Sequence, residues 1–514
     1  MRSSIRNIIY ILLLCILFVT PDIIYSLISS SFKVSNQLVT LLLLIPLSAG
    51  LVLNPYRLLS ITILSILMVL QLMQFFHIAY IGKQISPFAL YLMQNEMSDV
   101  LNEAKHVFFK YAYLIPIVVI PFLFISVLIK KTTKHKVGGV ILIALFVFDG
   151  TRLYMSRTSR FNPNESRITL DNSINAMFGY FIIKLKNYEV PNYLDYKVID
   201  TYKNDDEEIN IVYIMGESIN YNHMSLFGYE KDTTPKLKEL SKQENFYYTK
   251  GISGAISTIA SSKFMMNVIR EPNNIKLTSS DKTSLFSLAK QHGFKTFYLS
   301  AQEDDIVAAV APSDAIDVLV TKGNLPTKSK KTKDESLFDV FEKQTLSKKN
   351  FIVFHERALH SPYEKTIPEE YNKNPVFEDK YDNALSYLDY LISKTFNLFN
   401  QRKGKFYIIL TSDHNESRGE NGVFGHLSLI PQAGNVPMLF QSNDKEFLKK
   451  IRSIFSPTHY EIGKVIANVI GFQIENPNEK DNIFYINGVD YNGRCGYIKF
   501  RKDLENRMIK YIKE

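Results

Sequence analysis

The stretch INIVYIMGES, residues Ile209–Ser218, indicates the fold of the larger part of this chain. It is a short, β-branched apolar run that ends in Gly216 and Glu217, which is typical of a buried strand followed by a turn. NFIVFHE (350–356) and KFYIILTSDH (405–414) repeat the pattern, with helix-like segments between them. Short buried strands that alternate with helices predict an α/β domain with a mostly parallel sheet covered by helices on both faces.

Polar side chains follow each of these predicted strands. Glu217 follows the first, His355 lies at the end of the second with His360 in the loop behind it, and Asp413 and His414 follow the third. Each residue alone is more often a cap or a surface group than a ligand. In a parallel sheet, however, binding sites lie beyond the carboxyl ends of the strands. Carboxylate and imidazole ligands without thiolates favour zinc, and three protein ligands leave a coordination position open.

A hydroxyl-rich stretch, GISGAISTIASSKFMM (251–266), follows the first strand at a distance. A Ser or Thr hydroxyl bound to zinc has a lowered pKa and can attack as the alkoxide. The local sequence does not decide which hydroxyl that is. HERALH (355–360) has one residue too many for the H-E-x-x-H pattern, which excludes a zincin protease.

The first 155 residues differ from the rest because they hold long uncharged apolar runs, each near the ~20 residues that span a bilayer. No small-residue cleavage site follows the first run, so we expect an uncleaved helix. The net charge of +9 fits membrane topology better than nucleic-acid binding. The sequence predicts a membrane protein with five spans: Asn7–Leu27, Gln37–Leu53, Leu58–Ile81, Tyr111–Ile129 and Val137–Tyr154. Asp149 and Arg152 interrupt the last of these.

Basic residues set the orientation of such helices. With five spans, Arg2, Arg6, Arg57 and the lysines of 130–136 all fall on one side, which is then the cytoplasm. The C-terminal part is therefore expected outside. This gives a transmembrane domain over 1–155 with a periplasmic amphipathic segment at 82–110, a linker with helical pieces over 156–205, and a catalytic domain over 206–514.

The amphipathic segment carries Asn95, Asp99 and Glu103 at i, i+4 and i+8, which places the three on one helix face. One interpretation is a solvated face of an interfacial helix. The other is a polar face turned to a lipid headgroup at the outer surface. Cys15 lies in an apolar run, so a disulfide with Cys495 is not expected.

Two longer motifs carry a family resemblance: MGESINYNHMSLFGYEKDTTPKLKEL (215–240) and TSDHNESRGENGVFGH (411–426). With T-x-x-S and H-x(4)-H between them, the chain resembles the phosphoethanolamine transferases of the Gram-negative envelope, in the alkaline phosphatase/sulfatase superfamily. The resemblance implies a zinc-dependent enzyme of outer membrane biogenesis, embedded in the inner membrane with its catalytic domain in the periplasm. It also implies phosphatidylethanolamine as donor and lipopolysaccharide, at a core sugar or lipid A, as acceptor.

The resemblance also implies roles for single residues. The nucleophile is Thr258, with Ser261 three residues on, although Lys263 replaces the family's Pro and Ser257 is the nearest rival. Carried over by position, the metal ligands are Glu217, Thr258, Asp413 and His414; His360 and His426 contact the phosphoryl group or a second zinc; and Asn95, Asp99, Glu103 and His355 bind substrate.

Alternatives within the superfamily stay open at this point. A sulfatase is excluded because neither cysteine lies in a C-x-P-x-R context. Gly254 and Phe264 stand near where the lipid A-modifying branch has cysteines, which favours the core-type branch. A phosphoglycerol transferase of the lipoteichoic acid synthase type, and a non-catalytic lipid-binding relative, are the competing interpretations.

Overall fold

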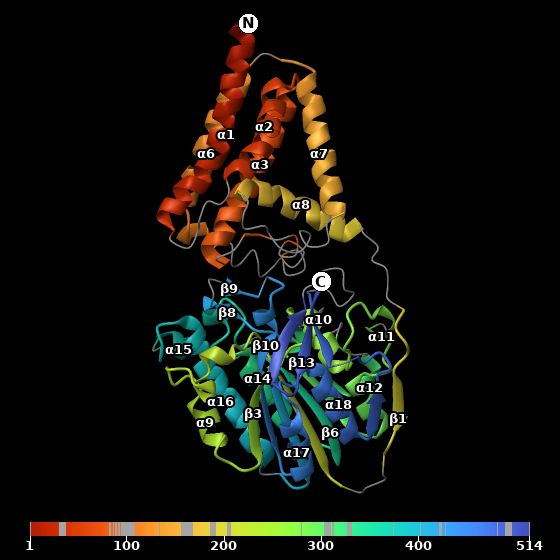
Figure 1. Cartoon of the computed structure of the whole chain (residues 1–514). Helices are drawn as coiled ribbons and strands as arrows, with labels where there is room; N and C mark the ends of the chain where they lie inside the picture. The colour runs from red at the N-terminus through yellow and green to blue at the C-terminus, as the bar shows by residue number, and fades with distance from the viewer. Residues whose placement is uncertain are drawn as a thin grey trace. The chain divides into compact units, whose positions relative to one another are not determined.

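The computed structural model of the chain forms two compact units (Figure 1). One unit comprises Met1–Asn187 with Arg418–Ser428, and the other comprises Tyr188–Ser417 with Leu429–Glu514. The domain boundaries expected from the sequence stay predictions. The structure describes residues 2–29, 37–81, 84–85, 87, 90, 93, 108–132, 134–155, 168–185, 192–202, 207–278, 280–302, 310, 313–325, 332–373, 375–400, 402–420, 424–426, 428–480, 482–488 and 496–512.

The N-terminal unit is helical. Figure 1 shows α1, α2, α3, α6 and α7 as elongated helices, with α8 lying crosswise near one end of α3 and α7 and contacting both. The bounds are α1 Arg2–Ile28, α2 Gln37–Leu53, α3 Arg57–Ile81, α6 Leu114–Lys130, α7 Val137–Met155 and α8 Thr169–Leu185. Among the described residues, two helices are long and apolar enough to cross a membrane, Ile5–Ile28 and Arg57–Tyr80. The five-span arrangement stays a prediction.

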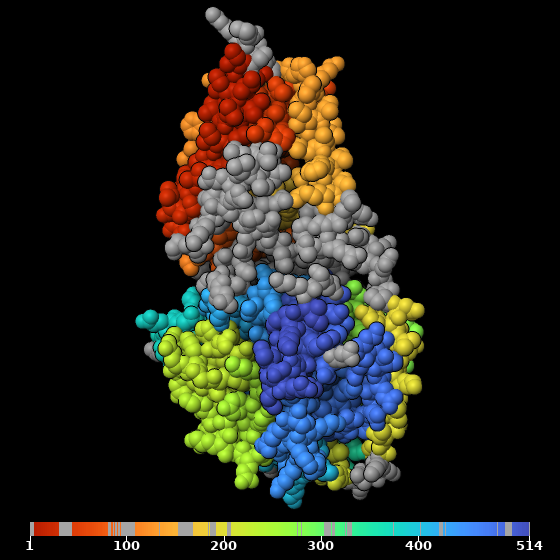
Figure 2. Space-filling model, viewed as in Figure 1, coloured from red at the N-terminus to blue at the C-terminus, as the bar shows by residue number. Residues whose placement is uncertain are grey.

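Many large apolar side chains of these helices are exposed, as expected of helices that face lipid. Figure 2 shows the space-filling surface of the chain in the same view as Figure 1. On α1 the side chain of Ile16 is 60% exposed, and on α7 that of Ile143 is 68% exposed. Inside the unit, Asp22 of α1 is buried and accepts hydrogen bonds from the backbone N–H and the hydroxyl of Thr169, both at 2.9 Å. Asp22 therefore satisfies a backbone donor at the start of α8.

The C-terminal unit is built on a seven-stranded sheet with the order β3-β10-β7-β2-β6-β4-β5. Only β10 runs antiparallel to its neighbours, so the sheet is mixed and mostly parallel, as predicted. The strands are β2 Ile209–Gly216, β3 Phe246–Ile252, β4 Lys295–Ser300, β5 Val318–Val320, β6 Lys349–His355, β7 Lys405–Ser412 and β10 Asn435–Ser442. The smaller sheets pair β1 (Lys197–Asp200) with β11 (Phe472–Glu475), β8 (Ser417–Arg418) with β9 (Phe424–Gly425), and β12 (Ile483–Asn487), β13 (Tyr497–Asp503) and β14 (Met508–Ile512) with one another.

Helices pack on both faces of the large sheet. Because side chains alternate along a strand, Phe351 and Phe354 of β6 point to opposite faces. Phe351 makes an edge contact with Phe286 of α12, whereas Phe354 stacks on Phe338 of α14. The helices of this unit are α9 Pro235–Leu240, α10 Thr258–Met266, α11 Ile275–Thr278, α12 Leu285–Gln291, α14 Lys333–Glu342, α15 Glu369–Lys373, α16 Lys380–Asn400, α17 Lys445–Ser453 and α18 His459–Ile470.

The strand register aligns the carboxyl ends of the three central strands. Gly216 of β2 lies opposite Ser412 of β7, and Met215 lies opposite His355 of β6. The next residue on β7, Asp413, donates its backbone N–H to the carbonyl of Gly216 at 2.9 Å. The residues that follow these strands therefore come together at one edge of the sheet.

Helix α18 begins at this edge and supports the loop before α10. Its N-cap, Thr458, forms a capping box with Glu461. The first helical residue, His459, is buried, with Nδ1 3.3 Å from the backbone nitrogen of Gly254 and Nε2 3.2 Å from the hydroxyl of Thr411. The start of α18 thus ties the hydroxyl-rich segment to the end of β7.

Replacing Thr458 with alanine removes the side-chain acceptor of this capping box. We expect Thr458→Ala to lower stability by about 1 kcal/mol, and the unfolding temperature by roughly 2–4 °C for a domain of this size. Thr458→Ser should lose far less because serine caps equally well. Thermal unfolding of the full-length protein in detergent, followed by circular dichroism, measures both; equal losses in the two variants would contradict the capping role.

Candidate metal centre

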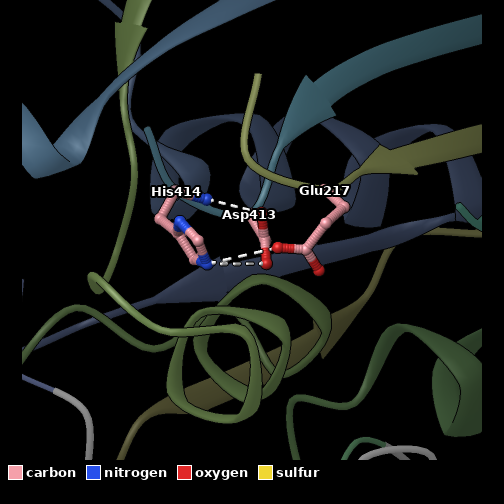
Figure 3. Close-up of side chains that lie close together, drawn as sticks. All are labelled: Glu217, Asp413 and His414. Atoms are coloured by element: carbon pink, nitrogen blue, oxygen red, sulfur yellow. Dashed lines mark hydrogen bonds and ion pairs between the residues drawn. The ribbon is translucent and has the colours of Figure 1, made fainter. Parts of the chain in front are cut away.

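Three buried side chains converge beyond the ends of β2 and β7: Glu217, Asp413 and His414 (Figure 3). One ligand atom from each lies within 4.8 Å of the others. The Nε2 atom of His414 is 3.3 Å from Oδ2 of Asp413 and 3.6 Å from Oε1 of Glu217. Figure 3 shows the imidazole edge and both carboxylates pointing at one another, which is the arrangement that ligands of a single ion adopt.

The turn after β2 positions Glu217. Ser218 has φ 56, a left-handed conformation that is costly for a residue with a side chain. The turn is held by hydrogen bonds: the backbone N–H of Ser218 donates to Oδ1 of Asp413 at 3.0 Å, and its hydroxyl donates to Oε1 of Glu217 at 2.7 Å. The backbone N–H of His414 donates to the same Oδ1 at 2.8 Å. These donors fix both carboxylates while Oδ2 of Asp413 faces the imidazole.

Thr258 brings a hydroxyl to the same place. It is the first residue of α10, and its Oγ1 is 3.3 Å from Oε2 of Glu217 and 3.4 Å from Nε2 of His414. One turn further along, the hydroxyl of Ser261 donates to the backbone carbonyl of Asp413, as does the hydroxyl of Ser253. The T-x-x-S spacing therefore anchors α10 to the strand end that carries Asp413, with Thr258 turned to the ligands.

The donor set fits a zinc ion. The two carboxylates repel each other, and burial removes the water that would otherwise stabilise their charges. A cation bound between them would offset both costs. Carboxylate oxygens and an imidazole nitrogen are zinc ligands, and the Thr258 hydroxyl lies within reach of the same point. Burial also keeps water from competing for the ion.

Two residues that the sequence did not indicate support this group: Gln302 contacts it directly, and Arg357 contacts Gln302. Gln302 donates through Nε2 to Oε2 of Glu217 at 2.8 Å and to the backbone carbonyl of Glu356 at 2.9 Å. Nη1 of Arg357 donates to Oε1 of Gln302 at 2.8 Å. Because guanidinium offers only donors, it fixes the amide oxygen of Gln302 towards itself and the amide nitrogen towards Glu217. Gln302 lies just beyond the end of β4, so the strand-end rule could have found it.

The two histidines near β6 take different positions. His355 is fully buried, and its Nδ1 is 2.9 Å from the hydroxyl of Tyr298. Burial lowers the pKa of His355 to about 4, so its ring is neutral at ordinary pH. His360 is half-buried, with Nδ1 2.6 Å from the carbonyl of Ser361 and 3.4 Å from Nη2 of Arg357.

The remaining predicted residues lie elsewhere in the chain. His426 is half-buried and belongs to the Arg418–Ser428 segment, which groups with the N-terminal unit. Asn95, Asp99 and Glu103 lie outside the described residues. Their roles stay predictions.

Comparisons with known proteins show what this chain is similar to. The family model described as Sulfatase matches residues 209–456. The chain is 26% identical over 314 residues to Kdo(2)-lipid A phosphoethanolamine 7''-transferase of Salmonella typhimurium, covering 54% of each protein. It is 28% identical over 262 residues to phosphoethanolamine transferase EptA of the same organism, covering 46% of this chain and 47% of EptA. The aligned region thus spans about half the length of these curated relatives.

A solved structure shares the fold over most of the chain. It is the integral membrane protein lipooligosaccharide phosphoethanolamine transferase A (EptA) from Neisseria meningitidis, with a TM-score of 0.58 and 18% identity. The match covers 84% of this chain and 88% of that one, so it includes the helical part as well as the α/β part. The chain thus matches the sulfatase family model over residues 209–456, and the curated relatives that it resembles there are phosphoethanolamine transferases.

Proposed function

We propose that this protein transfers phosphoethanolamine from phosphatidylethanolamine to lipopolysaccharide, through a covalent intermediate on Thr258. The observation that carries the proposal is the position of the Thr258 hydroxyl, 3.3 Å from Glu217 and 3.4 Å from His414 in a buried ligand set. The relatives are phosphoethanolamine transferases, which supports phosphoethanolamine as the transferred group. One of them is named for Kdo(2)-lipid A, which supports lipopolysaccharide as the acceptor.

Glu217, Asp413, His414 and Thr258 would hold a zinc ion. Bound zinc lowers the pKa of a coordinated hydroxyl and neutralises charge on a phosphoryl group. The Thr258 alkoxide then attacks the donor phosphorus: a bond from Oγ1 to phosphorus forms, the bond from phosphorus to the glycerol oxygen breaks, and diacylglycerol leaves after taking a proton. An acceptor hydroxyl or phosphate oxygen attacks the same phosphorus in the second step, and the Thr258 oxygen leaves.

The first turn of α10 supports this role of Thr258. Backbone N–H groups and the positive end of the helix dipole lie at a helix N-terminus, where they stabilise phosphoryl oxygens. Thr258 is the first residue of a nine-residue helix and places its side chain there. Ser257, the alternative nucleophile, is the N-cap residue with extended backbone. We assign the nucleophile to Thr258, since its contacts with Glu217 and His414 are those of a metal-bound hydroxyl.

We propose that the loop histidines, His360 and His426, transfer protons to the leaving oxygens. An imidazole can serve as acid in one step and as base in the next. His360 is half-buried beside Arg357, which adds positive charge near the transferred phosphate. His426 is the second candidate. His355, neutral and bonded to Tyr298, is a less suitable proton donor.

The proposed setting is the bacterial inner membrane. Five spans would place the catalytic unit in the periplasm, where Asn95, Asp99 and Glu103 would meet the donor's ethanolamine end. The acceptor is a core sugar or lipid A. A phosphoglycerol transferase would use the same nucleophile with phosphatidylglycerol, so the donor test below decides between the two headgroups.

The nucleophile is tested with donors labelled in the headgroup. Full-length protein in liposomes should become labelled from phosphatidylethanolamine, at a peptide that contains Thr258, and not from phosphatidylglycerol. Thr258→Ala should lose the label and at least 10²-fold of the transfer rate, as expected when a covalent nucleophile is removed. Ser257→Ala is the matched control and should keep both. Normal transfer by Thr258→Ala, or label from phosphatidylglycerol alone, would overturn the proposal.

The ion is tested by zinc content. Glu217→Gln and Asp413→Asn each remove a ligand charge, so purified full-length protein should lose most of its zinc as measured by mass spectrometry of the metal. Glu208→Gln is the matched control, because Glu208 is exposed just before the opposite end of β2. If the ligand variants keep as much zinc as the control, the centre lies elsewhere.

Gln302 is proposed to hold Glu217 in position. Gln302→Leu removes both hydrogen bonds of the amide, and the loss of such a support costs roughly 10- to 100-fold in metal affinity. Gln302→Glu should cost more, since it sets a second carboxylate against Glu217. Competition with a chelator measures the affinities, with the exposed Gln291→Leu as control. Unchanged affinity in both Gln302 variants would show that Glu217 needs no such support.

A further inference from the structure

The helical unit contains an apolar cavity that the proposed chemistry does not use. It has a volume of about 360 Å³ and lies between α2, α3, α7 and α8. All four helices belong to one compact unit. Apolar side chains form most of its lining, among them Leu47, Leu67, Leu142, Leu145, Phe146 and Ile174.

Two carboxylates lie at one end of this cavity. Asp149 near the end of α7 and Asp171 in the first turn of α8 both line it, and none of the described residues that line it is Lys or Arg. Behind them, Arg152 is 3.3 Å from Asp149 and donates to Oδ1 of Asn175 at 2.6 Å. The Nδ2 atom of Asn175 is 3.4 Å from Asp171. The cavity is therefore apolar over most of its lining. At the end where the two carboxylates lie, Arg152 neutralises Asp149, and Asp171 leaves an excess of negative charge.

The position of Asp149 is unusual for a structural residue. It lies in a helix whose neighbouring side chains, such as Ile143 and Phe148, are largely exposed and apolar. An ionisable side chain in a membrane helix is costly and is kept where it serves a pathway or a ligand. The same residue interrupts the fifth predicted span, and its carboxylate lies on the cavity side of α7 rather than the lipid side.

A space of this size needs an occupant. It corresponds to roughly a dozen water volumes, yet an apolar cavity does not hold water well. Left empty, its lining would lose dispersion contacts on one side. Between helices that face a bilayer, the available filler is a hydrocarbon chain. The negative end selects the headgroup: a cationic amine is attracted by Asp149 and Asp171, and an anionic headgroup is repelled.

We propose that this cavity is a holding site for an ethanolamine phospholipid, with an acyl chain among α2, α3 and α7 and the headgroup amine beside Asp149 and Asp171. The choice of lipid rests on the proposed function, because the same lipid is the donor. The inference of a bound acyl chain depends only on the size and the apolar lining of the cavity. Bound there, a donor molecule is held on the protein before its headgroup reacts, which raises its local concentration.

The test uses protein that cannot consume the lipid. Full-length Thr258→Ala is purified in a mild detergent, and the phospholipid that remains bound is extracted and quantified by mass spectrometry. Tryptophan is then added to this background at Leu145 of α7 or Leu47 of α2, both of which line the cavity. Ile143→Trp and Ile45→Trp are the matched controls, since these side chains lie two residues away on the same helices and are exposed.

We expect the parent protein to retain phosphatidylethanolamine in excess over phosphatidylglycerol, relative to the membrane it came from. Leu145→Trp and Leu47→Trp should each lose most of this lipid, and the two controls should keep it. Asp171→Asn should retain phospholipid but lose the preference for ethanolamine. Two filling variants are used because one of them could fail to fold. Gel filtration detects a variant that does not fold.

Three results would overturn the site: both filling variants retaining lipid as the controls do, phosphatidylglycerol retained as well as phosphatidylethanolamine, or a glycolipid of the lipid A type retained instead. These outcomes are separate from failure of the proposed function. Lipid retention is measured without any transfer, whereas transfer of the headgroup label is measured on protein with Thr258 intact. Label transfer without lipid retention refutes only the holding site, and retention without transfer refutes only the function.

Discussion

The electrostatic cost of two carboxylates buried side by side is the constraint on which this structure depends. Glu217 and Asp413 are placed next to each other by the register of β2 and β7, with Gly216 opposite Ser412. The fold compensates in part with hydrogen bonds from backbone N–H groups, from the Ser218 hydroxyl and from Gln302. The rest of the charge calls for a cation, which is why His414 and the Thr258 hydroxyl face the same point.

Thr258, the proposed nucleophile, and the proposed metal ligands belong to one hydrogen-bonded unit. Ser253 and Ser261, on either side of Thr258, both donate to the backbone carbonyl of Asp413. His459, at the start of α18, lies behind them with its ring nitrogens near Gly254 and Thr411. A shift of β7 would therefore move α10 with it. This coupling keeps the Thr258 hydroxyl close to Glu217 and His414, and the proposed catalysis by positioning would require that accuracy.

The helical unit also contains buried carboxylates, and they have different surroundings. Asp22 satisfies the first backbone donor of α8, and Gln71 donates to the same carboxylate at 3.2 Å. Asp149 and Asp171 instead line a cavity. Asp149 is paired with Arg152, and Asp171 accepts a hydrogen bond from Asn175, so both carboxylates have protein partners. What distinguishes them from Asp22 is that they also line a cavity of molecular size.

The sequence by itself determined the sheet and its edge. The apolar runs around 211, 352 and 408 predicted buried parallel strands, which the structure confirms. The polar residues after them, Glu217, Asp413 and His414, were expected to meet because the carboxyl ends of such strands lie at one edge. The choice between Ser257 and Thr258 came from a family resemblance, since adjacent hydroxyls have no distinguishing local signal.

Tertiary structure alone decided which way the remaining side chains turn. His355 ends its strand at the same edge, yet its Nδ1 lies against the Tyr298 hydroxyl rather than among the ligands. Gln302, which follows β4, donates to Glu217, and Arg357, which follows β6, donates to Gln302. Strand position fixes where a residue lies along the sheet, but the direction of a long side chain depends on packing partners far away in the chain. Those contacts join residues from different strands that are far apart in the sequence, so no local pattern encodes them.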